Sequence, residues 1–364
     1  MCNFINPSVK VGILNQNLGR DSMKTKVLFA SSLKPACDTR TEKLLRSFNG
    51  YDCFFCGVRN SHVLSQSTTW QYSRSLIFRI QLVFKFFVLV NKIKPQVIVM
   101  NSLEFVPVLK LLKHKLGFKL IYDMQEDYVK NITYHNGFKG LKRIVGIAYV
   151  QSVTNQLFKF VDGVIYAETV YQQEVAVPSL VLENKSILKV RRNKESANPI
   201  RLLFTGTLTK ECGVYQALEW LDKLEKIGAY ELIMIGHTPL VEDHKRLREI
   251  RKENFTYKGS LNPIAHQDLV DEMVSSDFGL ICYERSPSKK GKMPTKLFEY
   301  MSVFLPIICQ NDGLWSELVV QEKAGVVYRE SLTKLDFEDT FYEQDVKGVH
   351  WETEKLTNWL SKVI

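Results

Sequence analysis

The sequence lacks a regular set of cysteines, since its seven cysteines are scattered over 364 residues. An odd number without a spacing pattern argues against a disulfide framework and fits a reducing compartment. The chain also has no uninterrupted apolar run long enough to span a membrane. Its longest apolar stretch, 76–93, is broken by Arg79, Gln81, Lys85 and Asn91. We therefore expect a cytoplasmic protein, with no membrane-spanning helix.

A secretion signal is missing as well, because residues 1–22 are polar and hold no apolar core. The following segment, Met23 to Val27 (MKTKV), reads like a start that runs straight into a strand. We interpret residues 1–22 as a disordered extension or a mis-assigned start.

Several motifs of cofactor and metal chemistry are absent. Neither the GxGxxG dinucleotide fingerprint nor the GxxxxGK[ST] phosphate loop occurs, and neither HExxH nor a GxSxG elbow is present. Cys53 and Cys56 form a CxxC, but strand residues three apart point to opposite faces, which suits buried cysteines better than a metal. We expect no metal site and no cofactor.

What the chain does contain is enough apolar sequence for two cores, with 45% hydrophobic and 24% charged residues. Its net charge of +10 implies an anionic partner. Nucleic acid is disfavoured because no RNA-recognition motif accompanies the basic residues. Two apolar stretches with basic interruptions, 74–94 and 138–160, suit peripheral contact with an anionic membrane, although core helices with basic solvent faces explain them nearly as well.

Short apolar runs alternate with helical patterns along the whole chain, which indicates parallel α/β sheets. The polar segment 185–199 interrupts this alternation and marks a domain boundary. The expected strands are 27–31, 51–56, 96–101, 119–123 and 163–167 before it, and 200–205, 231–236, 255–258, 277–283, 305–309 and 325–328 after it. Ligands of such sheets bind at the carboxyl ends of the strands.

Two segments of the second half carry the chemical signal. The run LLFTGTL at 202–208, followed by Lys210 and Gly213, is a strand that turns into a helix beginning near Val214, a turn whose exposed amides suit phosphate. In PTKLFEYM at 294–301, Pro294 suits the first turn of a helix. The Glu299 carboxylate could accept hydrogen bonds from two ribose hydroxyls, although a solvated helix glutamate would look the same.

These residues resemble the nucleotide-binding domain of family 4 of the retaining glycosyltransferases. The shared features are a glycine- and lysine-containing loop after the first strand, a helix led by proline and lysine with an E-Y-M centre, and a following P-I-I strand. The likeness covers most of 200–330. Weaker likeness extends it to LIYDMQEDY at 120–128, SLKPACDTR at 32–40 and the Trp351-Glu352 tail.

The resemblance implies a GT-B architecture: two Rossmann-like domains with parallel sheets that face a cleft. Residues 23–190 would bind the acceptor, 200–345 the nucleotide sugar, and 346–364 would form a tail helix that returns to the N-terminal domain.

By the same resemblance, the donor is a UDP- or GDP-type nucleotide sugar. Glu299 would hold the ribose, and Lys296 with the amides around Pro294 and Thr295 would face the diphosphate. The rest of the donor site would comprise Gly206, Thr207 and Lys210 opposite the helix, and Tyr257 and Gly259 beside the base.

The acceptor domain of that family carries a D-x-H-E segment, which here reads Asp123, Met124, Gln125 and Glu126. Asp123, Gln125 and Glu126 are thus the candidate catalytic residues, although acids before a helix are also consistent with a solvated loop cap. Glutamine replaces the family's histidine. Gly291 and Cys212 also depart from the family pattern, at a glutamate and a loop cation.

The expected function is transfer of a hexose-type sugar, with retention and without a metal, to a glycan or lipid-linked acceptor in cell-surface polysaccharide synthesis at the inner face of the membrane. Two alternatives stay open: a sugar-nucleotide 2-epimerase, and a degenerate binding subunit that lacks catalysis.

Overall fold

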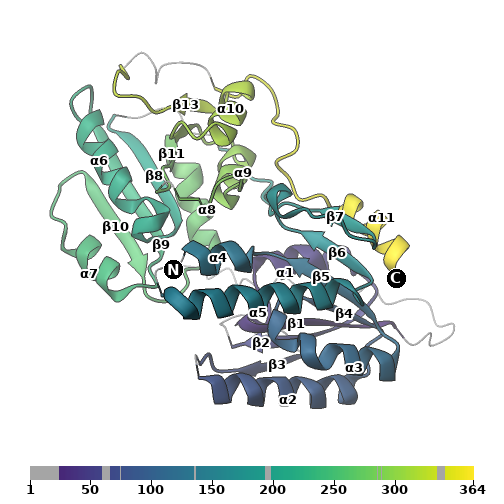
Figure 1. Cartoon of the computed structure of the whole chain (residues 1–364). Helices are drawn as coiled ribbons and strands as arrows, with labels where there is room; N and C mark the ends of the chain where they lie inside the picture. The colour runs from purple at the N-terminus through teal and green to yellow at the C-terminus, as the bar shows by residue number, and fades with distance from the viewer. Residues whose placement is uncertain are drawn as a thin grey trace, which may run out of the picture.

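A computed structural model describes residues 24–59, 66–73, 75–134, 137–192, 198–284, 286–287, 289–333 and 341–364. The predicted extension 1–22 lies outside these ranges. The described residues fold into two α/β domains, the first drawn in purple to teal and the second in green in Figure 1.

The N-terminal domain is built on a parallel sheet whose first strand lies in the middle, as in dinucleotide-binding folds. Its described strands have the order β3-β2-β1-β4-β5-β6-β7. They are β1 (Lys26–Pro35), β2 (Asp52–Val58), β3 (Ser67–Trp70), β4 (Val97–Met100), β5 (Lys119–Met124), β6 (Gly163–Tyr166) and β7 (Ser179–Val181).

Helices cover both faces of this sheet. On one face, apolar side chains of α2 (Leu76–Ile93), α3 (Val106–Leu116) and α5 (Gly140–Phe158) form a core with the strands. On the other face lie α1 (Thr39–Leu45) and α11 (Thr353–Val363). The remaining helical segments of this domain are η1 (Leu103–Phe105), α4 (Tyr128–Tyr134) and η2 (Thr169–Tyr171).

The C-terminal domain repeats the same topology. Its described strands are all parallel, in the order β10-β9-β8-β11-β12-β13. They are β8 (Ile200–Thr207), β9 (Tyr230–His237), β10 (Phe255–Ser260), β11 (Phe278–Ile281), β12 (Ile307–Cys309) and β13 (Gly325–Val327). The expected parallel α/β architecture is confirmed in both halves.

Two further cores hold the helices of this domain to its sheet. One contains α6 (Val214–Leu224) and α7 (Val241–Glu249), and the other α8 (His266–Ser275), α9 (Thr295–Ser302) and α10 (Leu314–Gln321). The short η3 (Lys210–Cys212) joins β8 to α6. The predicted helix starts near Val214 and after Pro294 are confirmed.

Two strands escaped the sequence analysis, β3 and β7. Both lie at the edges of the N-terminal sheet, and their sequences, STTW and SLV, are too short or too polar to stand out as apolar runs. On β2 the CxxC cysteines point to opposite faces, Cys56 into one core and Cys53 against the other. Burial raises the pKa of the Cys56 thiol to about 12, so it is an inert core thiol.

The chain crosses between the domains twice. After the crossing at 182–192 and the second domain, it returns along 341–352 to α11, drawn in yellow beside β6 and β7 in Figure 1. Leu356, Leu360 and Val363 of α11 join the core that contains Val27 and Phe29 of β1. The last segment of the sequence thus completes the first domain.

Candidate functional site

Two glycines lie at the carboxyl ends of neighbouring strands in the second domain. Gly206 of β8 is paired with Gly236 of β9, and both have positive φ, +102° and +154°. A Cβ on Gly236 would lie 1.8 Å from the Gly206 carbonyl oxygen. Only glycine permits so close an approach of two backbones. Gly206 therefore presents bare main chain at the end of β8, beside Lys296 of α9.

Lys296, the second residue of α9, lies next to this strand end. Its side chain runs past Gly206, where an added Cβ would lie 3.9 Å from the lysine Cε. The Nζ sits 3.7 Å from the centre of the Phe204 ring and 5.1 Å from that of Tyr283. Two residues predicted to face the diphosphate, Gly206 and Lys296, are thus brought together.

The Lys296 ammonium is buried and has no hydrogen-bond partner among the described residues. Its residue is 6% exposed, and this burial lowers the pKa of the amine to about 8. A buried charge without a partner is costly, so it marks a place prepared for an anion.

Glu299 lies one turn further along α9, and its Oε1 is 3.1 Å from Nε2 of His266 at the start of α8. The hydrogen bond to Glu299 raises the pKa of His266, while burial of the ring opposes it. The Glu299 side chain keeps 16% exposure. Sequence reasoning found Glu299 but not His266, because the two are 33 residues apart with no shared motif.

The start of α9 also meets the first domain. Pro294 caps the helix in an extended conformation, and Thr295 accepts a hydrogen bond at Oγ1 from Asn184 Nδ2 at 3.0 Å. Glu168, just after β6, accepts one from the Met293 backbone N–H at 2.9 Å. The carboxyl ends of the two sheets therefore face each other around α9.

Glu168 is a site residue that the sequence analysis missed. Burial raises the pKa of its carboxyl to about 7, with the hydrogen bond from Met293 opposing the rise. Its position directly after the predicted strand 163–167 was the available signal. Gly291 occupies the position at which the family has a glutamate. A Cβ at Gly291 would lie 3.2 Å from Val170, so the first domain fills the space that a side chain would need.

Thr207 and Lys210 lie further out along the same loop and are exposed. The backbone N–H of Lys210 donates to Asp243 Oδ2 at 3.4 Å, and Cys212 ends the short η3 helix. Both predicted residues border the loop, but neither side chain contacts Lys296 in the structure.

Tyr257 and Gly259, predicted beside the base, lie on β10. The Tyr257 hydroxyl is shared between Thr238 Oγ1 and His244 Nδ1, at 2.8 Å each. The Tyr257 ring covers Gly259, where an added Cβ would lie 2.3 Å from ring atoms. The Tyr257 hydroxyl is therefore occupied within the domain, and the role of this pair beside the base stays a prediction.

Asp123, a predicted catalytic residue, lies at the end of β5. It is 1% exposed and paired with Arg40, so the alternative of a solvated loop cap is wrong for this residue. The Arg40 Nε donates to both carboxylate oxygens at 3.0 Å, and Nη2 donates to Oδ1 at 2.8 Å. Arg40 also donates to the Leu182 carbonyl, so the pair ties β5 to the crossing segment. Asp123 also lines a small pocket with Asn101 and Gln125, and its catalytic role stays a prediction.

Gln125 and Glu126 are more exposed and belong to a small polar network. Gln125 Nε2 donates to Asp123 Oδ2 at 2.7 Å, and its Oε1 accepts from Lys34 Nζ at 3.1 Å. Lys34 also pairs with Glu126 at 2.6 Å. These contacts orient Gln125 beside the buried pair and leave no free base at this position.

The described residues contain no group of three or more His, Cys, Asp or Glu arranged to hold a metal ion. No helix among them is both long and apolar enough to cross a membrane.

No protein-family model matches the chain, and no curated protein does. Solved structures do resemble it. Sucrose-phosphate synthase from Thermosynechococcus elongatus shares 12% identity, with 93% of this chain and 94% of that chain covered and a TM-score of 0.62. Anabaena HepE in complex with UDP and glucose shares 13% identity, with 93% and 98% covered and a TM-score of 0.63.

A third similar structure is the lipopolysaccharide outer core galactosyltransferase WaaB, in its apo form, with 14% identity, 93% and 95% coverage and a TM-score of 0.51. All three matches extend over both domains, and at such identities the likeness is one of fold. The chain has the GT-B fold. The two facing Rossmann-like domains predicted from the sequence are therefore confirmed.

Proposed function

We propose that this GT-B chain is a glycosyltransferase that uses a nucleotide-sugar donor. The observation that carries the proposal is the buried ammonium of Lys296, which has no hydrogen-bond partner among the described residues and lies beside the main chain of Gly206. A diphosphate placed there would supply the missing counter-charge. The similar structure of HepE in complex with UDP and glucose supports the same choice of donor.

The transfer would proceed as the acceptor hydroxyl oxygen forms a bond to the anomeric carbon of the sugar and the bond between that carbon and the diphosphate breaks, with the hydroxyl proton passing to the leaving diphosphate. Negative charge grows on the leaving oxygens, and Lys296 with the backbone amides at the start of α9 stabilises it. Glu299 would accept hydrogen bonds from the ribose hydroxyls, as the family resemblance implies. The protein would thus act through fixed electrostatics, and the transfer would need no protein nucleophile.

Finer features of the proposal rest on the family resemblance. The donor would be a UDP- or GDP-linked hexose, transferred with retention and without a metal. The acceptor would be a glycan or a lipid-linked glycan of cell-surface polysaccharide synthesis. For metal independence, turnover should persist in EDTA, and loss of activity that manganese restores would contradict it.

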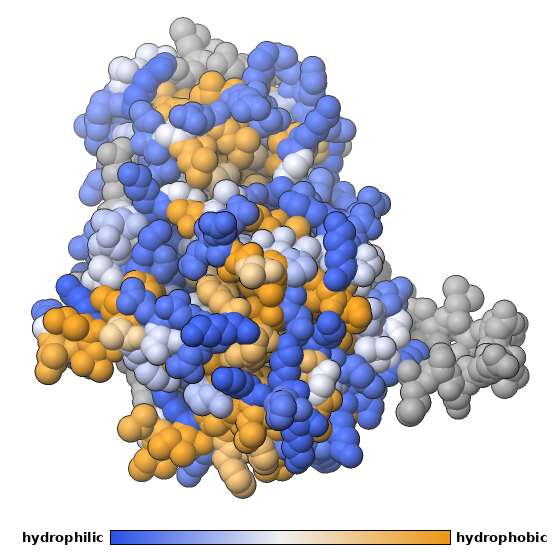
Figure 2. Space-filling model, turned by 45° about the vertical axis from the view of Figure 1, so that its right-hand side comes forward, coloured by the Kyte–Doolittle hydropathy of each residue, from blue (hydrophilic) through white to orange (hydrophobic). Residues whose placement is uncertain are grey.

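We also propose that the first domain docks on the anionic inner face of a cell membrane. One face of α2 exposes apolar side chains four residues apart, among them Leu76, Ile80, Phe84 and Val88, each at least 50% exposed. The start of α5 adds exposed apolar residues, Leu141, Ile144, Val145 and Tyr149. Figure 2 shows apolar surface along the lower part of this domain, where Figure 1 places α2.

The charges beside the exposed apolar residues of α2 and α5 indicate which kind of surface binds there. Basic residues flank both apolar stretches, Arg79, Lys85 and Lys92 on α2, and Lys142 and Arg143 on α5. An apolar stripe bordered by cations fits a surface of anionic lipid. Helices of a parallel sheet begin at its carboxyl edge, so both stretches start on the side of the acceptor and would meet a lipid-linked acceptor there.

The test is a binding and turnover experiment on the full chain. UDP and GDP are titrated by calorimetry, and release of nucleoside diphosphate from UDP- and GDP-sugars is followed with a panel of glycan acceptors. Lys296→Met keeps the volume and removes the charge, and should weaken nucleotide binding by at least about tenfold. Lys245→Met, at an exposed lysine of α7, is the matched control. Equal affinity in all three proteins would refute the donor site.

A second candidate is a subunit that binds the nucleotide sugar without catalysis. The observation in its favour is that Asp123 forms an ion pair with Arg40, and Gln125 donates a hydrogen bond to Asp123. Saturable nucleotide binding without turnover over the whole panel would favour this candidate over the enzyme.

A further inference from the structure

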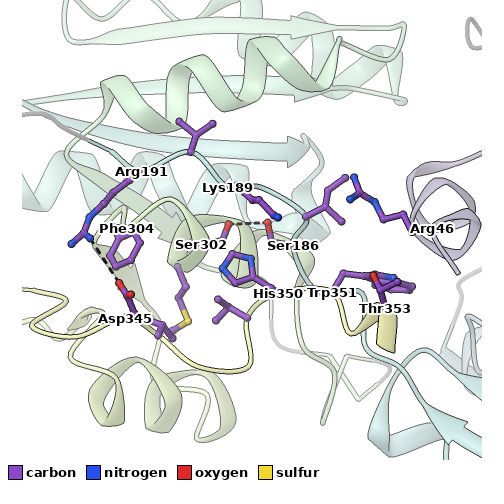
Figure 3. Close-up of a pocket in the computed structure, with 15 residues that line it drawn as sticks. Arg46, Ser186, Lys189, Arg191, Ser302, Phe304, Asp345, His350, Trp351 and Thr353 are labelled. Atoms are coloured by element: carbon purple, nitrogen blue, oxygen red, sulfur yellow. Dashed lines mark hydrogen bonds and ion pairs between the residues drawn. The ribbon is translucent and has the colours of Figure 1, made fainter. Parts of the chain in front are cut away.

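A cavity of about 540 Å³ lies where the chain crosses between the two domains. It is separate from the loops around Gly206 and Lys296. Its walls come from four segments: the end of α1, the crossing 186–191, the end of α9 with the following turn, and the returning segment 345–353. Figure 3 shows Lys189, His350 and Arg46 gathered around it from these different segments.

The cavity is positively charged. Arg46, Lys189 and Arg191 stand against one acid among the lining residues, Asp345, which gives +3 − 1 = +2 with His350 neutral. Asp345 is taken by Arg191 at 3.8 Å, and the Arg191 guanidinium also lies 4.1 Å from the centre of the Phe304 ring. Arg46 and Lys189 have no acidic partner among the described residues.

The inner wall combines an aromatic surface with buried hydroxyls. The Trp351 ring faces Arg40 on one side, at 5.6 Å, and lines the cavity. Its Nε1 is buried and lacks a partner among the described residues. Ser186 is 1% exposed and lies 2.8 Å from the Ser302 hydroxyl, as Figure 3 marks.

We propose that this cavity binds a small phosphate-bearing molecule that bridges the two domains. Arg46 belongs to the first domain and Lys189 to the crossing. Because neither forms an ion pair among the described residues, both charges stay available to a ligand. Arginine and lysine together suit a phosphate, and the volume also holds a small organic body against Phe304 and Trp351.

The cavity and the donor site share one helix. The first turn of α9 carries Lys296, and its last residue, Ser302, lines the cavity and donates to the Glu299 carbonyl at 2.8 Å. A ligand in the cavity would therefore contact the far end of the helix on which the donor is proposed to bind. The inference itself rests only on the cavity and stands independently of the proposed function.

The experiment uses the full chain carrying Lys296→Met, which removes the other phosphate-attracting charge. Glucose 6-phosphate is titrated by calorimetry, with glucose as the uncharged match, and short-chain phosphatidic acid below its micelle concentration represents a lipid headgroup. We expect saturable one-to-one binding of a phosphate probe and none of glucose. Tighter binding of the sugar phosphate identifies a soluble ligand, and tighter binding of phosphatidic acid identifies a lipid.

The bridging arrangement is tested by substitutions on both sides. Arg46→Ala and Lys189→Ala should each weaken binding by at least about tenfold, the loss of one charge-assisted hydrogen bond. Lys245→Ala, an exposed lysine far along the chain on α7, should leave the affinity unchanged. Absence of saturable binding of both phosphate probes, or binding that survives Arg46→Ala and Lys189→Ala, would overturn the proposal.

Discussion

Lys296 is a buried cation whose surroundings do not neutralise it, and this has opposite effects on stability and on binding. Burial lowers its pKa from 10.5 to about 8, so charging it in the folded state costs free energy at neutral pH. That difference corresponds to about 3 kcal/mol. The free protein carries this cost, and a bound anion would relieve it.

The first prediction concerns pH. A diphosphate binds the protonated amine, so affinity for UDP or GDP should be constant from about pH 7 to pH 8, where the terminal phosphate is ionised, and fall toward tenfold per pH unit above it. Near pH 8.5 the protein should take up a proton when the nucleotide binds. Calorimetry detects this uptake as a binding enthalpy that changes with the ionisation enthalpy of the buffer. Lys296→Met should abolish the pH dependence and, without ligand, raise the melting temperature. Equal affinity at pH 7 and 9.5 would contradict the prediction.

Asp123 and Arg40 form the buried pair that ties β5 to the first crossing, with side chains 1% and 5% exposed. Removing one partner leaves a buried charge alone. We predict that Asp123→Ala lowers the free energy of unfolding by about 3–5 kcal/mol, measured by urea denaturation.

The control is Glu126→Ala, at the partly exposed pair with Lys34, which should cost less than about 1 kcal/mol. A stable Asp123→Ala protein that has lost turnover would instead restore the catalytic role that the family resemblance implies.

At the scale of elements, α2 has two apolar faces. Leu82, Phe86 and Val90 point into the core, while Ile80 and Phe84 are 65% and 67% exposed. A helix apolar on both faces in a domain of ordinary composition has an unfilled interaction surface. The sequence showed the helix, but the division into a core face and an outer face needed the sheet against which it packs.

The third prediction follows from that outer face. Phe84→Asp should reduce cosedimentation with anionic liposomes by roughly tenfold or more, because a large apolar contact is replaced by a repelled charge. Binding of the unchanged chain should also weaken as salt rises, since the basic flanks are screened. Val320→Asp, an equally exposed position on α10 of the other domain, is the control. Equal binding by both variants would remove α2 from the contact.

At the scale of the whole molecule, the end of the chain is part of the first domain. Trp359 of α11 packs so close to β6 that a Cβ on Gly163 would lie 2.8 Å from its ring. Two crossings thus link the domains, and the core of the first domain contains residues from near both ends of the described chain.

We predict that Trp359→Ala destabilises the protein by about 3–5 kcal/mol, since it empties a large buried volume. Proteolysis should then cut first within the N-terminal domain, although the substitution lies near the end of the sequence. Asn358→Ala, exposed on the same helix, should leave melting and cleavage unchanged. First cleavage within 200–333 would show that α11 stabilises the other domain.

The sequence by itself determined the two parallel sheets, most of their strands and the start of α9 after Pro294. These features depend on apolar periodicity and on helix-capping residues, which are properties of neighbours along the chain. It also placed Gly206 at a strand end, where parallel sheets bind ligands, and Lys296 at the start of a helix. Their roles toward a donor stay predictions.

Tertiary structure alone decided which distant groups pair. Asp123 meets Arg40 across 83 residues, and Glu299 meets His266 across 33, with no local pattern to announce either contact. It also decided that Lys296 is buried, because exposure depends on what packs above a helix and not on the helix itself. The physical reason is that burial and pairing are set by how the elements pack, and these two properties control the charges on which the proposed chemistry depends.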